Sequence, residues 1–148
     1  MFKPHSLVQY DGGGYDGCIS ELNYAWFDAG GRFHDIYSSG YLGCNSLAKL
    51  KAAYANRPGD FDIYRLDNPT EAERCADETP ISHLLGIAQW LDEHAPGIML
   101  LPKCDECGER FDARAGCGAD PHGIGGVMQE FRRLLCPDHA EACDLVYV

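Results

Sequence analysis

The sequence predicts an α+β fold, with a small antiparallel sheet and two helices followed by a smaller C-terminal module. Near the N-terminus, apolar and polar residues alternate over several short stretches, which is typical of half-buried strands. Two later stretches repeat apolar residues at the spacing of a helix. The last third of the chain gathers paired cysteine and histidine residues, and we expect this module to be organised around them.

Four short stretches are predicted to form the sheet. The run His5–Tyr10 is apolar and strand-like. Apolar side chains recur at period two within residues 18–28, and the glycines between Asp28 and Arg32 then form a hairpin connection to a third strand, residues 32–37. Phe61–Leu66 is the fourth predicted strand, and Ile98–Leu101 is expected as a further one leading into the C-terminal module.

Two helices are expected between and after these strands. The first has its apolar stripe at Leu47, Leu50 and Tyr54. Asn45 or Ser46 can cap its first turn. The second helix is predicted to open with Thr79 as its cap and Pro80 at its first position, and Ala95–Gly97 ends it. The acidic stretch Asp67–Glu78 between them is expected to be an exposed polar linker.

The C-terminal module carries two ligand pairs of the C-x2-C and C-x2-H type. The ligands are Cys104, Cys107, Cys136 and His139. Two such pairs match the tetrahedral coordination of a structural zinc ion. Gly108 allows the tight turn that the first pair needs, because glycine tolerates positive φ. The second pair is expected at a helix start, where thiolates are favoured.

Three neighbouring groups leave the ligand set open to one alternative. Cys117 and His122 lie within the interval between the pairs, and Cys143 follows the second pair. Any of the three can replace a ligand, because ligand spacing constrains the geometry only loosely. The interval ends in Val127–Leu135, which is predicted to be a strand or a short helix.

Residues 100–148 resemble the treble-clef family of zinc fingers. In that family a knuckle carries the first ligand pair, a hairpin follows, and the start of a helix carries the second pair. The resemblance implies a structural zinc and no particular function, since the family hosts many. We expect two parts, residues 1–97 and residues 98–148, with the short connection Ala95–Gly97 favouring their packing into one body.

Length and composition place the chain among ordinary globular proteins. The 148 residues are 45% hydrophobic and include eight cysteines, fewer than a disulfide scaffold uses. We see no signal peptide after the first residues and no stretch apolar enough to span a membrane. A cytoplasmic protein with reduced thiols is therefore expected.

Charge argues against direct binding to nucleic acid. The net charge is −11, with 14 acidic and seven basic residues in 1–99 and nine acidic and five basic residues in 100–148. Proteins that grip phosphates need clustered lysines and arginines. We expect instead that the chain binds the basic surface of a partner protein, such as a component of a nucleic-acid-binding complex.

Two sets of residues are expected to form that partner surface. The aromatic anchors are Tyr10 and Tyr15 beside a glycine-rich loop, with Trp26 and Tyr37 in the hairpin. The acidic residues are Glu71, Glu73, Asp77 and Glu78. Opposite charges speed association, while apolar anchors lengthen the lifetime of a complex. The loop around Gly12–Gly14 has a simpler interpretation, which we favour: a tight connection where backbones approach closely.

The segment Val8–Cys18 resembles uncharacterised proteins carried by phages, plasmids and integrating elements. That resemblance extends over about the first 45 residues. It implies an accessory role such as inhibition of a CRISPR or restriction complex.

Two other functions are weighed against binding. A zinc-finger regulator would contact nucleic acid through Arg110, Arg114, Arg132 and Arg133. A thiol enzyme would use Cys44, which precedes a predicted helix, with His34 as its base. The sequence contains no H-E-x-x-H, G-x-S-x-G or dinucleotide-binding motif, and four zinc ligands leave no open position for chemistry. We therefore expect no enzyme.

Overall fold

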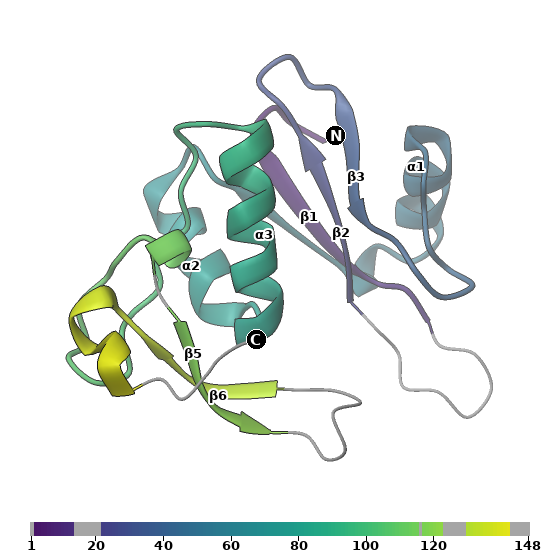
Figure 1. The fold of residues 1–148 in the computed structure, drawn as a ribbon. Coiled ribbons are helices and arrows are strands. Elements are labelled where there is room, and N and C mark those ends of the chain that lie inside the picture. Colours follow the sequence, from purple (N-terminus) through teal and green to yellow (C-terminus); the bar gives the residue numbers. More distant parts are fainter. Residues whose placement is uncertain (1, 14–21, 116, 123–129, 143–148) are drawn as a thin grey trace. The chain divides into compact units, whose positions relative to one another are not determined.

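The computed structural model describes residues 2–13, 22–115, 117–122 and 130–142 (Figure 1). For residues 117–122, 130–133 and 140–142 it describes the backbone alone. The chain forms two compact units, Met1–Asn68 and Pro69–Val148. The boundary predicted from the sequence lies between residues 97 and 98. The helix that precedes this point, Ile81–His94, belongs to the C-terminal unit.

The N-terminal unit is built on a four-stranded antiparallel sheet, as expected. Its strands are β1 (Ser6–Asp11), β2 (Leu22–Phe27), β3 (Phe33–Tyr37) and β4 (Phe61–Arg65), in the order β3-β2-β1-β4. In the central register, Val8 lies between Ala25 and Ile63. The short 3-10 helix η1 (Pro58–Asp60) leads into β4. The α+β class is confirmed.

Asp28 organises the hairpin between β2 and β3. Its Oδ1 accepts hydrogen bonds of 2.9 Å from the backbone N–H groups of Gly30 and Arg32. Its Oδ2 lies 2.9 Å from Nε2 of His34. These contacts lower the pKa of the Asp28 carboxyl, first through His34 and then through the Arg32 backbone. Gly31 takes the positive φ, 80°, that the turn requires.

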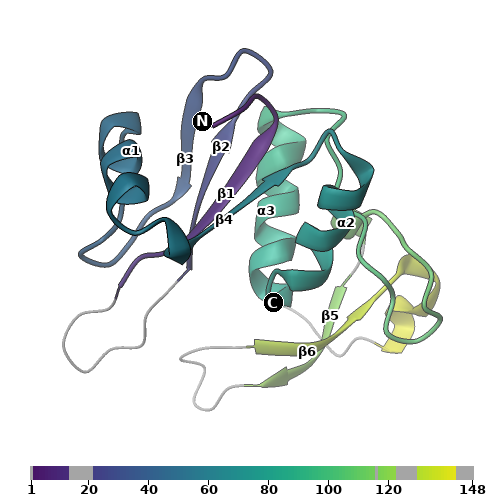
Figure 2. The same ribbon diagram turned by 180° about the vertical axis from the view of Figure 1, so that it is seen from behind.

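Helix α1 (Leu47–Asn56) covers one face of this sheet (Figures 1 and 2). Ser46 is the cap, with its side chain accepting from the Lys49 N–H at 3.3 Å. Leu50 is fully buried. The core beneath the helix consists of Val8, Tyr10, Ala25, Phe27, Cys44, Leu50 and Phe61.

The backbones at Gly12, Gly13 and Gly40 approach closely. A Cβ at Gly40 would lie 2.3 Å from the carbonyl oxygen of Gly12 and 2.4 Å from that of Gly13. The Leu42 N–H donates to the Gly12 carbonyl at 3.0 Å. The described part of the glycine-rich loop is therefore a tight packing connection. Gly14 lies outside the described residues.

The acidic stretch predicted as a linker forms a helix instead. Helix α2 (Pro69–Glu78) buries Cys75 and Ala76. Thr79 does not cap the next helix, because its hydroxyl donates to the Cys75 carbonyl at 2.7 Å and closes α2. The stretch misleads because only one narrow side of it is apolar.

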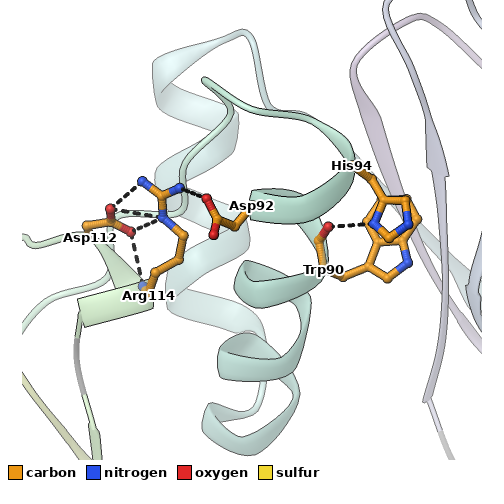
Figure 3. Close-up of polar contacts among 5 residues, drawn as sticks. All are labelled: Trp90, Asp92, His94, Asp112 and Arg114. Atoms are coloured by element: carbon orange, nitrogen blue, oxygen red, sulfur yellow. Dashed lines mark hydrogen bonds and ion pairs between the residues drawn. The ribbon is translucent and has the colours of Figure 1, made fainter.

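Helix α3 (Ile81–His94) follows, with Pro80 at its cap position and no side-chain hydrogen bond there. Its buried stripe is Leu84, Ile87, Ala88 and Leu91. Arg114 bridges Asp112 and Asp92 and so joins α3 to the 3-10 helix η2 (Ala113–Ala115) (Figure 3). Elsewhere on α3, the rings of Trp90 and His94 stack with centroids 4.0 Å apart.

The described backbone of the C-terminal unit also includes a pair of strands and a short helix. Strands β5 (Cys117–His122) and β6 (Glu130–Leu135) pair antiparallel, and the 3-10 helix η3 (Pro137–Ala142) follows. The strand expected at Ile98–Leu101 does not form. Instead, a single bridge pairs Lys103 with Arg110.

Candidate metal centre

The first ligand pair lies on a tight turn between Cys104 and Gly108. The Gly108 N–H donates to the Cys104 carbonyl at 2.8 Å, and Gly108 has a φ of +75°. The Glu106 N–H points at Sγ of Cys104 at 3.4 Å. Cys104 and Cys107 are thereby turned to the same side, and the role expected of the glycine is confirmed.

The second ligand pair lies at the start of η3. Cys136 precedes Pro137, and the His139 N–H donates to the Cys136 carbonyl at 3.0 Å. This single 3-10 turn places both side chains on one side of the backbone. The helix start expected here is present, with 3-10 geometry over its six residues.

The four ligand atoms of Cys104, Cys107, Cys136 and His139 all lie within 4.8 Å of one another. Sγ of Cys107 lies 3.9 Å from Sγ of Cys136. Nδ1 of His139 lies 3.8 Å from Sγ of Cys104 and 3.2 Å from Sγ of Cys136.

These separations fit a tetrahedral zinc ion. With Zn–S bonds of about 2.3 Å and Zn–N bonds of about 2.05 Å, two sulfurs lie about 3.8 Å apart and a sulfur lies about 3.6 Å from a nitrogen. The observed sulfur pair matches the first value, and the two distances to His139 lie on either side of the second. Three thiols and an imidazole are also the donor types that zinc prefers.

Burial differs sharply among the three thiols. Cys104 is 1% exposed and Cys136 5%, and both pack with Leu135 and Phe111. Cys107 is exposed. Burial opposes ionisation of Cys104, yet backbone N–H groups, first that of Cys136, lower its pKa to about 6. The thiolate that binds a metal is therefore favoured at this position.

Asp105 ties the two ligand pairs together, and sequence reasoning missed it. Its carboxylate accepts the Leu134 N–H at 2.7 Å, while its backbone N–H donates to the Leu134 carbonyl at 2.9 Å. The first pair is thus fixed to the end of β6, immediately before Cys136. The only signal in the sequence was the acidic residue inside the C-x2-C motif. That signal does not identify Leu134 as its partner, because Leu134 is distant in the sequence.

Arg110 joins the same module to helix α2. Its guanidinium donates to the two carboxylate oxygens of Asp77 at 3.2 and 3.0 Å and lies 3.7 Å from Glu73. It also donates to the Leu101 carbonyl at 2.6 Å. Two of the acids expected to face a partner therefore hold an arginine within their own unit.

The other acids of the expected set are also on α2. Glu78 lies 3.4 Å from Arg74, one turn earlier on the helix. Glu71 is in the first turn, where the helix dipole stabilises a negative charge. Their role in partner binding stays a prediction.

The expected aromatic anchors divide between core and surface. Tyr10 and Trp26 are each 1% exposed. Tyr10 lies in the sheet core, its hydroxyl accepts the Cys44 N–H at 2.9 Å, and burial raises its pKa to about 12. Tyr37 is 46% exposed, and Tyr15 lies outside the described residues. Tyr37 is the described member of the set that lies on the surface.

The residues of the alternative functions are engaged elsewhere. Cys44 is buried, burial raises the pKa of its thiol, and its Sγ donates to the Leu42 carbonyl at 3.4 Å. His34 is held by Asp28. Two arginines of the expected basic patch form ion pairs within the unit: Arg110 pairs with Asp77 on α2, and Arg114 bridges two aspartates.

Several further candidates fall outside the description. The side chains of Cys117, His122, Arg132 and Arg133 are not among the described side chains, nor is any part of Cys143. The alternative ligands therefore stay predictions.

Comparison of the chain with protein families, characterised proteins and solved structures finds no match. Among the described residues, no helix combines the length and the apolar character that crossing a bilayer requires.

Proposed function

We propose that this chain is a zinc protein whose Cys3His site holds the C-terminal module, and that it works by binding a partner protein with a basic surface. The observation that carries the proposal is the convergence of four ligand atoms within 4.8 Å from two segments far apart in the sequence. Three thiols and an imidazole at these separations offer a metal ion a complete set of ligands, and a cation stabilises the thiolates that would otherwise stay protonated beside one another.

The site is suited to a structural role. All four positions of a tetrahedral ion are filled by protein atoms, which leaves no position for a substrate or an activated water. The module around it contributes a small core: Cys104, Leu135 and Cys136, with Phe111 packed against them. Zinc binding would supply folding energy that this core lacks.

The order of elements supports the treble-clef architecture. The turn that carries Cys104 and Cys107 comes first, the β5–β6 hairpin follows, and η3 carries the second pair. We propose that the zinc module belongs to this architectural class. No particular activity follows from that assignment.

The uneven distribution of charge supports a basic partner. Met1–Asn68 contains eight acidic and six basic residues, whereas Pro69–Val148 contains fifteen acidic and six basic ones. A zinc ion bound by three thiolates adds one more negative charge. The surface also offers apolar side chains that can anchor a complex: Tyr37, Tyr41, Met99 and Leu101 are each at least 37% exposed.

Binding is better supported than the two alternatives. The described arginines near the site are paired with carboxylates, which weakens their case as phosphate ligands. The buried thiol of Cys44 has a raised pKa, the opposite of an activated nucleophile. A narrower role, as an inhibitor of a CRISPR or restriction complex encoded by a mobile element, rests on the N-terminal resemblance alone and stays a prediction.

Metal analysis tests the first half of the proposal. Protein purified without added zinc should contain one zinc ion per chain, and a strong chelator should remove the ion and lower the melting temperature. A stoichiometry near zero, with an unchanged melting curve in chelator, would contradict it.

Partner capture tests the second half. Proteins captured from host cells should be lost when three acids of the C-terminal unit are neutralised together: the partly buried Glu71 and the exposed Glu109 and Asp138. The control is Asp62→Asn, which removes an exposed acid from the N-terminal unit. Tight binding of purified protein to duplex DNA at physiological salt would instead support the zinc-finger regulator.

A further inference from the structure

We propose that the metal site is also a redox switch, in which hydrogen peroxide oxidises Cys107 and Cys136 to a disulfide and the site releases its ion. The inference rests on the proposed zinc binding and adds a form of regulation to the same site. It assigns different roles to the three cysteine ligands.

Exposure singles out Cys107 as the point of attack. Of the described cysteines, Cys44, Cys75, Cys104 and Cys136 are buried, and only Cys107 is exposed. A small oxidant in solution therefore reaches its sulfur first, and thiolates rather than thiols react with peroxides. Zinc coordination keeps this sulfur as a thiolate even though it lies in water.

Distance selects Cys136 as the resolving partner. The two sulfurs lie 3.9 Å apart, and a disulfide needs about 2.05 Å. Cys107 must cover most of the difference, since Cys136 is 5% exposed and packed in the small core. The chain next to Cys107 is a turn at Gly108, which is exposed and has no atom within 4 Å of an added Cβ. That turn has room to shift.

The chemistry balances with the peroxide as the only oxidant. The Cys107 thiolate attacks the O–O bond, takes one oxygen as a sulfenic acid and releases hydroxide. The Cys136 thiolate then attacks the Cys107 sulfur, the S–S bond forms, and a second hydroxide leaves. Two electrons pass from the thiolates to the peroxide. Cys104 and His139 remain, and two ligands do not hold a structural zinc ion.

Zinc-loaded protein treated with hydrogen peroxide tests the switch. A chromogenic chelator should record the release of one zinc ion per chain, and peptide mapping should find a Cys107–Cys136 disulfide. Dithiothreitol with added zinc should restore the loaded protein. A Cys104–Cys107 disulfide, or a sulfinic acid at Cys107 with zinc released, would overturn the proposed pairing.

Cys107→His is the matched variant, because it keeps four ligands and removes the exposed thiol. It should release zinc about tenfold more slowly than the wild type at the same peroxide concentration. Release at the wild-type rate would overturn the proposal. If the variant binds no zinc, the proposal is tested by the peptide map of the oxidised wild type, which must contain the Cys107–Cys136 disulfide.

The experiment separates this inference from the proposed function. Protein that never binds zinc contradicts the proposed function. Protein that binds zinc and retains it in excess peroxide contradicts only the switch.

Discussion

Arg110 donates hydrogen bonds to both carboxylate oxygens of Asp77, at 3.2 and 3.0 Å, although the two residues lie 33 positions apart in the sequence. The same guanidinium donates to the Leu101 carbonyl at 2.6 Å. This side chain therefore connects the acidic helix α2 to the chain on both sides of the turn that carries Cys104 and Cys107. Part of the negative charge of α2 serves the fold of its own unit.

Replacing Arg110 with lysine should cost more than neutralising its partner. Asp77→Asn should lower the free energy of unfolding by about 0.5–1 kcal/mol, since the pair is partly exposed. Arg110→Lys should cost about 1–2 kcal/mol, because an ammonium group cannot span two acceptors in the same planar geometry. Urea unfolding of both variants measures the difference.

The double variant and a control complete that test. Asp77→Asn combined with Arg110→Lys should be less destabilised than the sum of the single variants, because the two residues share one contact. Arg74→Lys, whose partner lies on the same exposed helix face, should change stability by at most about 0.5 kcal/mol. If Arg110→Lys and Arg74→Lys lower the free energy of unfolding equally, the contact between Arg110 and Asp77 does not stabilise the unit.

Cys107→Ser should report on the metal rather than on packing. The side chain is exposed, so losing its burial costs almost nothing. If the missing ligand weakens zinc binding 100-fold, stability falls by about 2.7 kcal/mol in zinc-containing buffer. In the presence of a strong chelator, wild type and variant should have the same melting temperature. A persistent difference in chelator would show that the residue acts without metal.

The sequence predicted the elements that have their own local signals. The four sheet strands are short runs rich in apolar and aromatic residues, and apolar residues recur at helical spacing in α1 and α3. The Cys/His cluster was also predictable, because residues at i and i+3 leave a local pattern around Cys104 and around Cys136. These signals survive because each can be recognised within a short window.

What escaped prediction depends on contacts between distant residues. Helix α2 looks polar because only Cys75 and Ala76 are buried. The alternation of Tyr10 with its neighbours marks it as a strand residue, but its place in the core depends on α1 and on Cys44. The clamp at Asp105 has its partner in β6. No short window of sequence contains such pairs.

Acid should weaken the β2–β3 hairpin through Asp28. Its folded pKa lies below the ordinary value, because His34 and then the Arg32 backbone stabilise the carboxylate. The stabilisation is therefore complete above the ordinary carboxyl pKa of about 3.9, and it is lost as pH falls through the lower folded pKa. Asp28→Ala should flatten this part of the stability profile.

The measurement is unfolding by urea at a series of pH values below 6. Wild type should lose stability more steeply than Asp28→Ala as the pH falls, while Asp62→Asn, an exposed acid on β4, should follow the wild type. Parallel curves for wild type and Asp28→Ala would mean that the folded carboxyl titrates as it does in the unfolded chain.

Asp105→Ala should weaken zinc binding although the residue is not a ligand. Its carboxylate accepts the Leu134 N–H at 2.7 Å, and the loss of that charged hydrogen bond costs about 1.5–3 kcal/mol. The cost falls on the state in which both ligand pairs face one ion, so zinc affinity should drop by about 10- to 100-fold. Competition with a chelator of known affinity measures the change. Glu109→Ala removes an exposed acid from the same turn and should leave affinity within about threefold of wild type. If Glu109→Ala weakens zinc binding as much as Asp105→Ala does, the effect is due to charge near the ion and not to the Leu134 clamp.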